Sequence, residues 1–199
     1  MPDKAAQILK TAERMFAEGR YHEITLDEIC KEAGVGKGTI YRYFQDKEHL
    51  FWQVILSGLD ELVASAEKVA EQEQDTGKGL RKLMHTVASF FAEREGLFGL
   101  MWSESLRGSG HKRDVWKQWH QKDEKILSVA ARFIVRGMEE GRYASRLSPA
   151  GAARLLLGMV RTGQRERKDM PGGKDWPLAI VDLFEQGMLV RNERKGKHA

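Results

Sequence analysis

Apolar side chains recur along most of the chain at spacings of three and four residues rather than in strict alternation with polar ones. This period is typical of helices that bury one face, so the pattern predicts an all-α protein of about nine helices. The first helix is expected to begin after the capping residue Asp3 and to end at Gly19. Its apolar stripe consists of Ala5, Ile8, Leu9, Ala12 and Phe16.

A second helix shows two sequence signals for its start and one for its end. Thr25 and Glu28 have the spacing of a capping box, and Ile24 is placed to pack on Ile29 across the cap. Gly34 stands where the end of this helix favours a left-handed residue. The spacing therefore predicts a short helix followed by a tight turn.

The third predicted helix, over 37–44, has two unlike sides. Ile40 and Phe44 are four residues apart, so they share a face that is expected to pack against a core. The opposite side, turned toward solvent or a ligand, consists of Gly38, Thr39, Arg42 and Tyr43.

Asp46 is expected to cap a long fourth helix, and Pro149 stands at the favoured first position of a later one. Polar breaks are predicted over 72–79, 107–111 and 170–174. The remaining helices are expected at about 80–95, 98–106, 113–140, 148–167 and 176–190.

These boundaries predict two domains and a tail. Residues 1–50 would form a three-helix domain, residues 51–190 a larger helical domain, and residues 191–199 a basic flexible tail. The net charge of +4 does not by itself indicate nucleic acid, because residues 1–52 contain eight Lys/Arg and nine Asp/Glu.

The remaining composition excludes several classes of protein. No segment approaches the roughly 20 apolar residues of a membrane helix, and the N-terminus lacks the apolar core of a signal peptide, so a cytoplasmic protein is expected. Cys30 is the only cysteine, and the six histidines are scattered without a His-Glu-x-x-His spacing. We therefore expect no metal, no cofactor, no catalytic residues and no enzymatic activity.

The second and third helices together have the features of a helix-turn-helix, whose second helix fits the major groove of DNA. Glycines at 34, 36 and 38 permit a tight turn and a close approach to phosphates. Lys37, Thr39 and Arg42 are the expected contacts to base edges. A phosphate-binding loop is rejected, since Lys31 stands where its first glycine belongs and Gly38 where it needs Ser or Thr.

Residues 5–52 resemble the DNA-binding domain of TetR-type transcriptional regulators. The shared motif comprises Phe16, Gly19, Thr25, Ile29, Ala33-Gly34-Val35, Gly38-Thr39-Ile40-Tyr41, Tyr43-Phe44 and Lys47-Glu48-His49-Leu50. The resemblance implies phosphate contacts by Thr25, Tyr41, Tyr43 and Lys47. It implies that Lys37, Gly38 and Thr39 face bases. Gly36 and Arg42 are also among the residues expected to bind DNA.

The resemblance also implies that the larger domain binds an effector and forms a homodimer. The predicted dimer contact consists of Leu155, Leu156, Met159, Val160 and Gly163 with Ile180, Leu183, Phe184, Gly187 and Met188. The predicted effector pocket consists of Phe91, Phe98, Met101, Trp102, Trp119, His120 and Phe133. Burial within a single subunit is the alternative for the first set, and ordinary core packing is the alternative for the second.

The sequence thus predicts a ligand-responsive regulator, a repressor in the first instance, that binds a palindromic operator in double-stranded DNA as a homodimer. A small, apolar effector would release it from DNA. The alternative is a helical ligand-binding or scaffold protein whose first domain does not bind DNA. The sequence leaves open the operator, the effector, the regulated genes, activation instead of repression, and the number of dimers on each operator.

Overall fold

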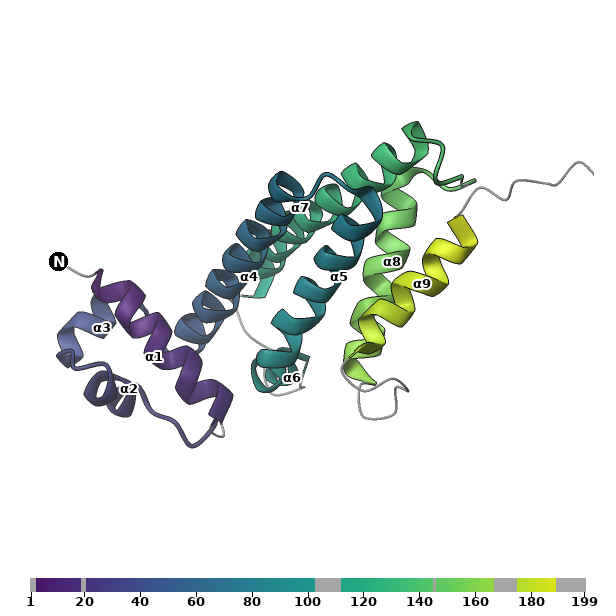
Figure 1. Ribbon diagram of the computed structural model, residues 1–199. Helices are drawn as coiled ribbons and strands as arrows, with labels where there is room; N and C mark the ends of the chain where they lie inside the picture. The colour runs from purple at the N-terminus through teal and green to yellow at the C-terminus, as the bar shows by residue number, and fades with distance from the viewer. Residues whose placement is uncertain (1–2, 19–20, 103–111, 145, 167–174, 189–199) are drawn as a thin grey trace, which may run out of the picture. The chain divides into compact units, whose positions relative to one another are not determined.

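The computed structural model describes residues 3–18, 21–102, 112–144, 146–166 and 175–188, without the side chains of 100–102, 112–113 and 165. The described residues form nine helices, as the sequence predicts (Figure 1). They are α1 (Lys4–Glu18), α2 (Leu26–Glu32), α3 (Lys37–Tyr43), α4 (Lys47–Gln72), α5 (Thr76–Glu93), α6 (Glu95–Trp102), α7 (Lys112–Glu139), α8 (Pro149–Arg165) and α9 (Trp176–Met188). The tail over 191–199 and Gly19 lie outside the described residues.

The predicted starts of two helices are confirmed by their capping contacts. The Asp3 carboxylate accepts a hydrogen bond from the backbone N–H of Ala5 at 3.0 Å, which satisfies a donor that has no partner inside α1. The Asp46 carboxylate accepts from the N–H of His49 at 2.7 Å and begins α4 in the same way. Local side chains therefore set these helix boundaries, as capping principles predict.

Helix α5 begins within the stretch 72–79, which the sequence predicted to be a break. Its start is fixed by Asp75, whose carboxylate accepts from the N–H of Lys78 at 2.7 Å. Two glycines in the first turn are tolerated because each leaves room for a large neighbour. A Cβ on Gly77 would overlap the Arg142 guanidinium, and one on Gly79 would overlap the Phe133 ring. Glycine thus marks close packing here rather than a loop.

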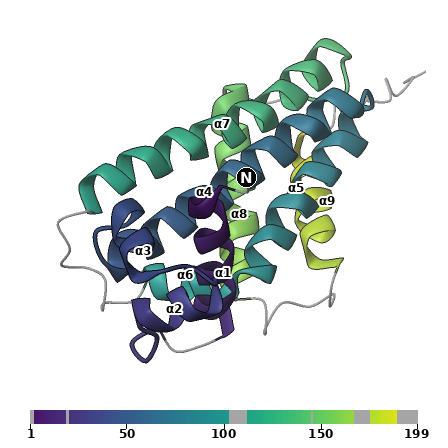
Figure 2. The same ribbon diagram turned by 90° about the vertical axis from the view of Figure 1, so that its left-hand side faces the viewer.

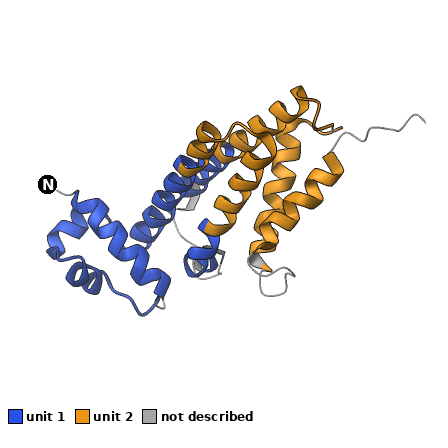
Figure 3. Cartoon of the chain, viewed as in Figure 1, with its two compact units in different colours: residues 1–64, 90–124 blue, residues 65–89, 125–199 orange. Residues whose placement is uncertain are grey.

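By internal contacts the chain divides into two compact units, which Figure 3 colours separately. Unit 1 comprises residues 1–64 and 90–124, and unit 2 comprises residues 65–89 and 125–199. This division differs from the predicted domains 1–50 and 51–190, because segments of α4, α5 and α7 belong to each unit. The functional division near residue 50 stays a prediction.

Within unit 1, helix α6 lies against α1 of the N-terminal three helices. Arg94 joins three elements there, since its guanidinium pairs with Glu13 at 2.7 Å and with Glu61 at 2.9 Å. Gly96 permits the close approach, because an added Cβ would lie 3.0 Å from the Ala17 carbonyl oxygen. The N-terminal helices are thereby braced by a helix from far along the sequence.

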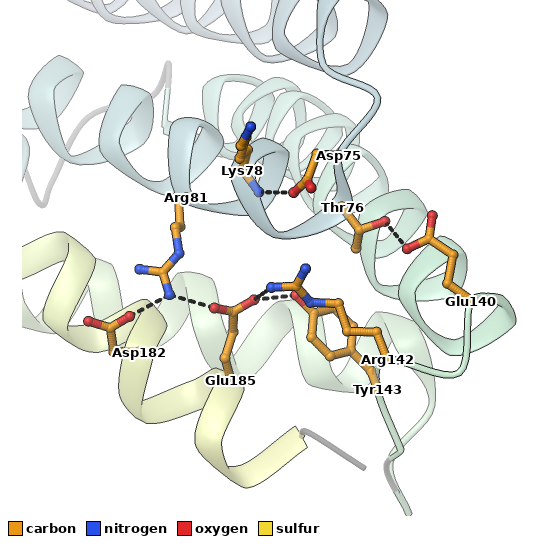
Figure 4. Close-up of polar contacts among 9 residues, drawn as sticks. All are labelled: Asp75, Thr76, Lys78, Arg81, Glu140, Arg142, Tyr143, Asp182 and Glu185. Carbon is orange, nitrogen blue, oxygen red and sulfur yellow. Dashed lines mark hydrogen bonds and ion pairs between the residues drawn. The ribbon is translucent and has the colours of Figure 1, made fainter.

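Unit 2 contains a buried carboxylate that links three segments, drawn in Figure 4. Glu185 of α9 is 4% exposed. Its carboxylate accepts a hydrogen bond from Arg81 of α5 at 2.6 Å. It also accepts hydrogen bonds from two residues that follow α7, from Arg142 at 3.3 Å and from the Tyr143 hydroxyl. Burial, together with Glu185, raises the pKa of Tyr143. This cluster fixes α9 against the rest of unit 2.

Tyr21, in the connection before α2, packs between Phe16 and Phe51 with ring centroids 5.5 and 5.3 Å away. Burial raises the pKa of Tyr21 to about 12, above its value near 10 in an unfolded chain. The folded protein therefore holds the phenol proton more tightly. Its contribution to stability is complete below pH 10 and is lost as the pH rises toward 12.

We expect the free energy of unfolding of the wild-type protein to fall, relative to that of Tyr21→Phe, by about 2 kcal/mol between pH 9 and 12. Phenylalanine keeps the ring packing but has no proton to lose, so it is the matched control. Urea unfolding of both proteins across this range measures the difference. An unchanging difference would show that Tyr21 ionises freely in the folded state.

No helix in the described part of the chain is both long and apolar enough to cross a membrane.

Candidate nucleic-acid interface

Helix α2 and the turn after it are built as the sequence predicts. The Thr25 hydroxyl accepts from the N–H of Glu28 at 3.2 Å, and the Glu28 carboxylate accepts from the N–H of Thr25 at 2.8 Å. This reciprocal pair is the predicted capping box. At the other end, Gly34 has φ of +62°, and the N–H of Val35 donates to the Cys30 carbonyl at 3.0 Å. These features form a Schellman turn that directs the chain into α3.

Helix α3 lies against α1 and α2 (Figure 2) and has one inward and one outward face. Ile40 is fully buried and Phe44 is 4% exposed, which confirms the predicted core side. Tyr41 is 55% exposed and Tyr43 is 37% exposed. Other exposed predicted DNA contacts are Gly36, Lys37, Gly38 and Arg42, while Thr39 is half-buried.

Two glycines leave the outward side of α3 open. A Cβ built on Gly36 or on Gly38 would meet no atom of this chain within 4 Å. Neither glycine has the positive φ that would require it for backbone reasons. The space beside both glycines is therefore free of other atoms of this chain.

Two cations of the predicted interface have partners on the same surface. The Lys37 ammonium donates to the Asp27 carboxylate of α2. The Arg42 guanidinium lies 4.9 Å from the Tyr43 ring centroid and donates to its hydroxyl at 3.0 Å. Both arrangements extend a long side chain in a defined direction, and both are exposed enough to rearrange on binding.

Lys47 has structural contacts that sequence reasoning missed, and Thr25 has a further bond to its predicted partner Glu28. The Lys47 ammonium donates to the carbonyls of Tyr21 and Ile24 at 2.9 and 2.8 Å and lies 4.5 Å from the Tyr21 ring centroid. Burial lowers the pKa of Lys47. The Thr25 hydroxyl also donates to Glu28 at 2.9 Å. No sequence signal reveals the carbonyl partners, because they depend on how the α1–α2 connection folds.

Three of the predicted effector residues lie together in unit 1. Phe91 and Phe98 have ring centroids 4.6 Å apart, and Phe98 and Trp119 have centroids 6.0 Å apart. His120 is exposed beside Trp116. Phe133 belongs to unit 2, where it is 1% exposed and packs over Gly79. The side chains of Met101 and Trp102 lie outside the described residues.

The predicted dimer residues of α8 and α9 divide into exposed and buried sets. Leu155 is 55% exposed, Leu183 is 65% exposed, Gly187 is open and Met159 is half-buried. Gly163 is packed within the chain, where an added Cβ would overlap Trp176. The residues already buried in one subunit are Leu156, Val160, Gly163, Ile180, Phe184 and Met188. Only the exposed set can add new contact area between subunits.

The described residues contain no group of three His, Cys, Asp or Glu side chains placed to hold a metal ion. Cys30 is 4% exposed, and burial raises the pKa of its thiol. A neutral, buried thiol is a poor nucleophile.

Comparisons with known proteins agree with this geometry. Residues 8–54 match the family described as bacterial regulatory proteins, tetR family. The HTH-type transcriptional regulator YhgD of Bacillus subtilis is 31% identical over 187 residues, which cover 92% of this chain and 94% of that protein.

Two solved structures of lower identity share the fold. A TetR/AcrR-family regulator from Thermobifida fusca is 21% identical, with a TM-score of 0.77 over 93% of this chain and 98% of that one. The regulator FadR of Bacillus subtilis, solved in complex with stearoyl-CoA, is 20% identical, with a TM-score of 0.72 over 92% and 98%. The chain with its capped helix-turn-helix belongs to the tetR family and is a transcriptional regulator.

Proposed function

We propose that the protein is a repressor that binds a palindromic operator as a homodimer and leaves DNA when a small, apolar effector binds. The outward face of α3 is the observation that carries the proposal. It combines hydroxyls, two cations and two glycines whose outer side is empty. A helix of this kind fits the major groove, where donors and acceptors identify each base pair.

The proposed contacts divide into positioning and reading. Tyr41 and Tyr43 are exposed phenols of α3 and would donate to phosphates. Lys37, Thr39 and Arg42 would contact base edges, with Gly36 and Gly38 admitting the DNA backbone. Thr25 and Lys47 would contact phosphates from the start of α2 and of α4, in addition to their internal bonds.

Selection from random-sequence duplexes with the purified protein tests this proposal. We expect enrichment of an inverted repeat whose half-sites are about one helical turn, 34–36 Å, apart or a multiple of that, because two copies of α3 must reach one face of the duplex. Failure to enrich any sequence would favour the alternative of a ligand-binding protein without DNA binding. Enrichment of a single unrepeated site would contradict the homodimer.

The exposed face of α8 and α9 supports the proposed homodimer. Leu155 and Leu183 are the most exposed of the large apolar side chains described in unit 2. Gly187, four residues after Leu183, has open space where a side chain would be. Exposed leucines on two helices that contact each other are suited to a symmetric four-helix contact with a second copy. The packed residues of the predicted set would support these helices from within each subunit.

Leu183→Asp is expected to raise the dissociation constant of the dimer about 10- to 100-fold, because it places a charge in an apolar contact. Val135→Asp is the matched control, since Val135 is another exposed apolar side chain of unit 2, 38% exposed, but belongs to α7 rather than to α8 or α9. Sedimentation velocity over a range of concentrations measures the effect. Equal dissociation constants for the two variants would place the dimer contact elsewhere.

The aromatic cluster of Phe91, Phe98 and Trp119 supports an apolar effector, because pockets are lined mainly by such side chains. Stearoyl-CoA, the ligand of the solved FadR complex, is a reasonable first compound to test. We expect an apolar ligand to release the protein from its selected DNA, with coenzyme A alone as the control for the polar part. Unchanged DNA binding across a series of acyl chain lengths would count against this class.

A further inference from the structure

An ion pair joins the two helices of the DNA-binding motif. Asp27 is on the first turn of α2, and its carboxylate accepts a hydrogen bond from the ammonium of Lys37, the first residue of α3. The two side chains are 54% and 67% exposed. The contact raises the pKa of Lys37, so the side chain remains a full cation. Without DNA, the Asp27 carboxylate therefore pairs with Lys37, one of the cations of the proposed DNA-binding surface.

The rest of the N-terminal region shows the same internal balance of charge. Residues 1–52 contain nine acidic and eight basic side chains. Arg14 pairs with Glu32, and Lys47 donates to two backbone carbonyls. A region with this balance has little general attraction for phosphates, which is the main source of affinity for DNA of any sequence.

We propose that Asp27 is a specificity-determining residue, which competes with DNA phosphates for Lys37 and so suppresses binding to sequences other than the operator. The pair is exposed, so its rupture costs little when α3 is fully seated and Lys37 has a base edge to bind. On DNA of unrelated sequence, Lys37 would exchange its ion pair with Asp27 for an ion pair with a phosphate, with little net gain in affinity. Asp27 then raises specificity because it weakens binding to sequences other than the operator.

This inference rests on the proposed DNA-binding function, and Asp27→Asn tests it. Asparagine keeps the shape and removes the charge. On a random-sequence 30-bp duplex, we expect about two- to fivefold tighter binding than the wild type shows. The plot of log affinity against log salt should also become steeper, by about 1 to 2 units for a dimer, because each freed Lys37 neutralises a further phosphate. The ratio of operator to random-duplex affinity should fall.

Glu32→Gln is the matched control. It removes one negative charge from the same helix and breaks the ion pair of Glu32 with Arg14, whose two side chains are each 51% exposed. A general effect of net charge would change both variants equally, which would overturn the proposal. Weaker binding by Asp27→Asn on every duplex would also overturn it, because Asp27 would then serve to pre-orient Lys37.

A double-mutant cycle with Lys37→Met tests whether Asp27 acts through Lys37. In the Lys37→Met background, Asp27→Asn should leave random-duplex affinity and its salt dependence nearly unchanged. The same gain as in the wild-type background would show direct repulsion of phosphates and would overturn the competition. Thermal unfolding of each variant checks that α2 remains folded.

Failure of the proposed function itself would look different. The wild-type protein would then enrich no sequence in the selection experiment, so there would be no operator affinity to compare.

Discussion

Replacing Glu185 with alanine is expected to lower the free energy of unfolding by about 2–4 kcal/mol. The substitution removes the shared acceptor of Arg81, Arg142 and Tyr143. Tyr143 is 3% exposed, so its hydroxyl would lose its partner where water does not replace it. The two arginine side chains are 35% and 37% exposed and regain part of their hydration, which limits the loss.

Asp182→Ala is the matched control for this prediction. Asp182 pairs with the same Arg81 and lies three residues earlier in α9, but its side chain is 51% exposed. Exposed pairs contribute about 0–1 kcal/mol, so Asp182→Ala should have a small effect. Urea unfolding of the two variants and the wild type measures the difference. Equal losses would mean that burial of Glu185 does not make its bonds stronger than those at the surface.

Gly38→Glu is expected to abolish specific DNA binding and to leave the fold intact. A Cβ at Gly38 meets no atom of this chain, and glutamate favours a helix over glycine by roughly 0.6 kcal/mol. The new side chain would stand on the outward face of α3 with a charge opposed to phosphate. We expect affinity for the selected operator to fall about a thousandfold or more, to the level of unrelated DNA.

Gly99→Glu provides the comparison for Gly38→Glu. Gly99 is an exposed glycine of α6 whose added Cβ also meets nothing within 4 Å, so the substitution has the same charge and a similar helical setting. Thermal unfolding and fluorescence anisotropy with operator DNA report fold and binding separately. Retained binding by Gly38→Glu, or equal loss in both variants, would contradict the assignment of α3 as the recognition helix.

The N-terminal motif was the part of the structure most fully predicted from sequence. The capping box of Thr25 and Glu28, the left-handed Gly34 and the burial of Ile40 all follow from local residue chemistry. Each depends on neighbours within a few positions, so spacing alone contains the information. The same holds for the capping of α1 and α4 by aspartate.

The predictions that depended on distant contacts were less complete. The polar stretch 72–79 was predicted to be a break, but Gly77 and Gly79 within it lie in α5, where Arg142 and Phe133 fill the space of their missing side chains. Gly163 was expected to permit contact between subunits, whereas in one chain it accommodates Trp176. The sequence does not show whether the space beside a glycine is filled by solvent, by a partner chain or by another part of the same chain.

The candidate site shows the same limit. Sequence reasoning identified the outward residues of α3, since helical period determines which residues share a face. It did not identify Asp27 as the partner of Lys37 or the two carbonyls as partners of Lys47. These contacts depend on the crossing of α2 and α3 and on the path of the α1–α2 connection, which no local spacing records.

Dimethyl sulfate protection of the selected operator tests most directly whether the outward face of α3 enters the major groove. Guanine N7 lies in the major groove and adenine N3 in the minor groove, so methylation at each position reports one groove. We expect bound protein to protect guanine N7 in two clusters about one helical turn apart, and Gly38→Glu to remove that protection. Protection of adenine N3 alone, with guanine N7 fully reactive, would contradict the account.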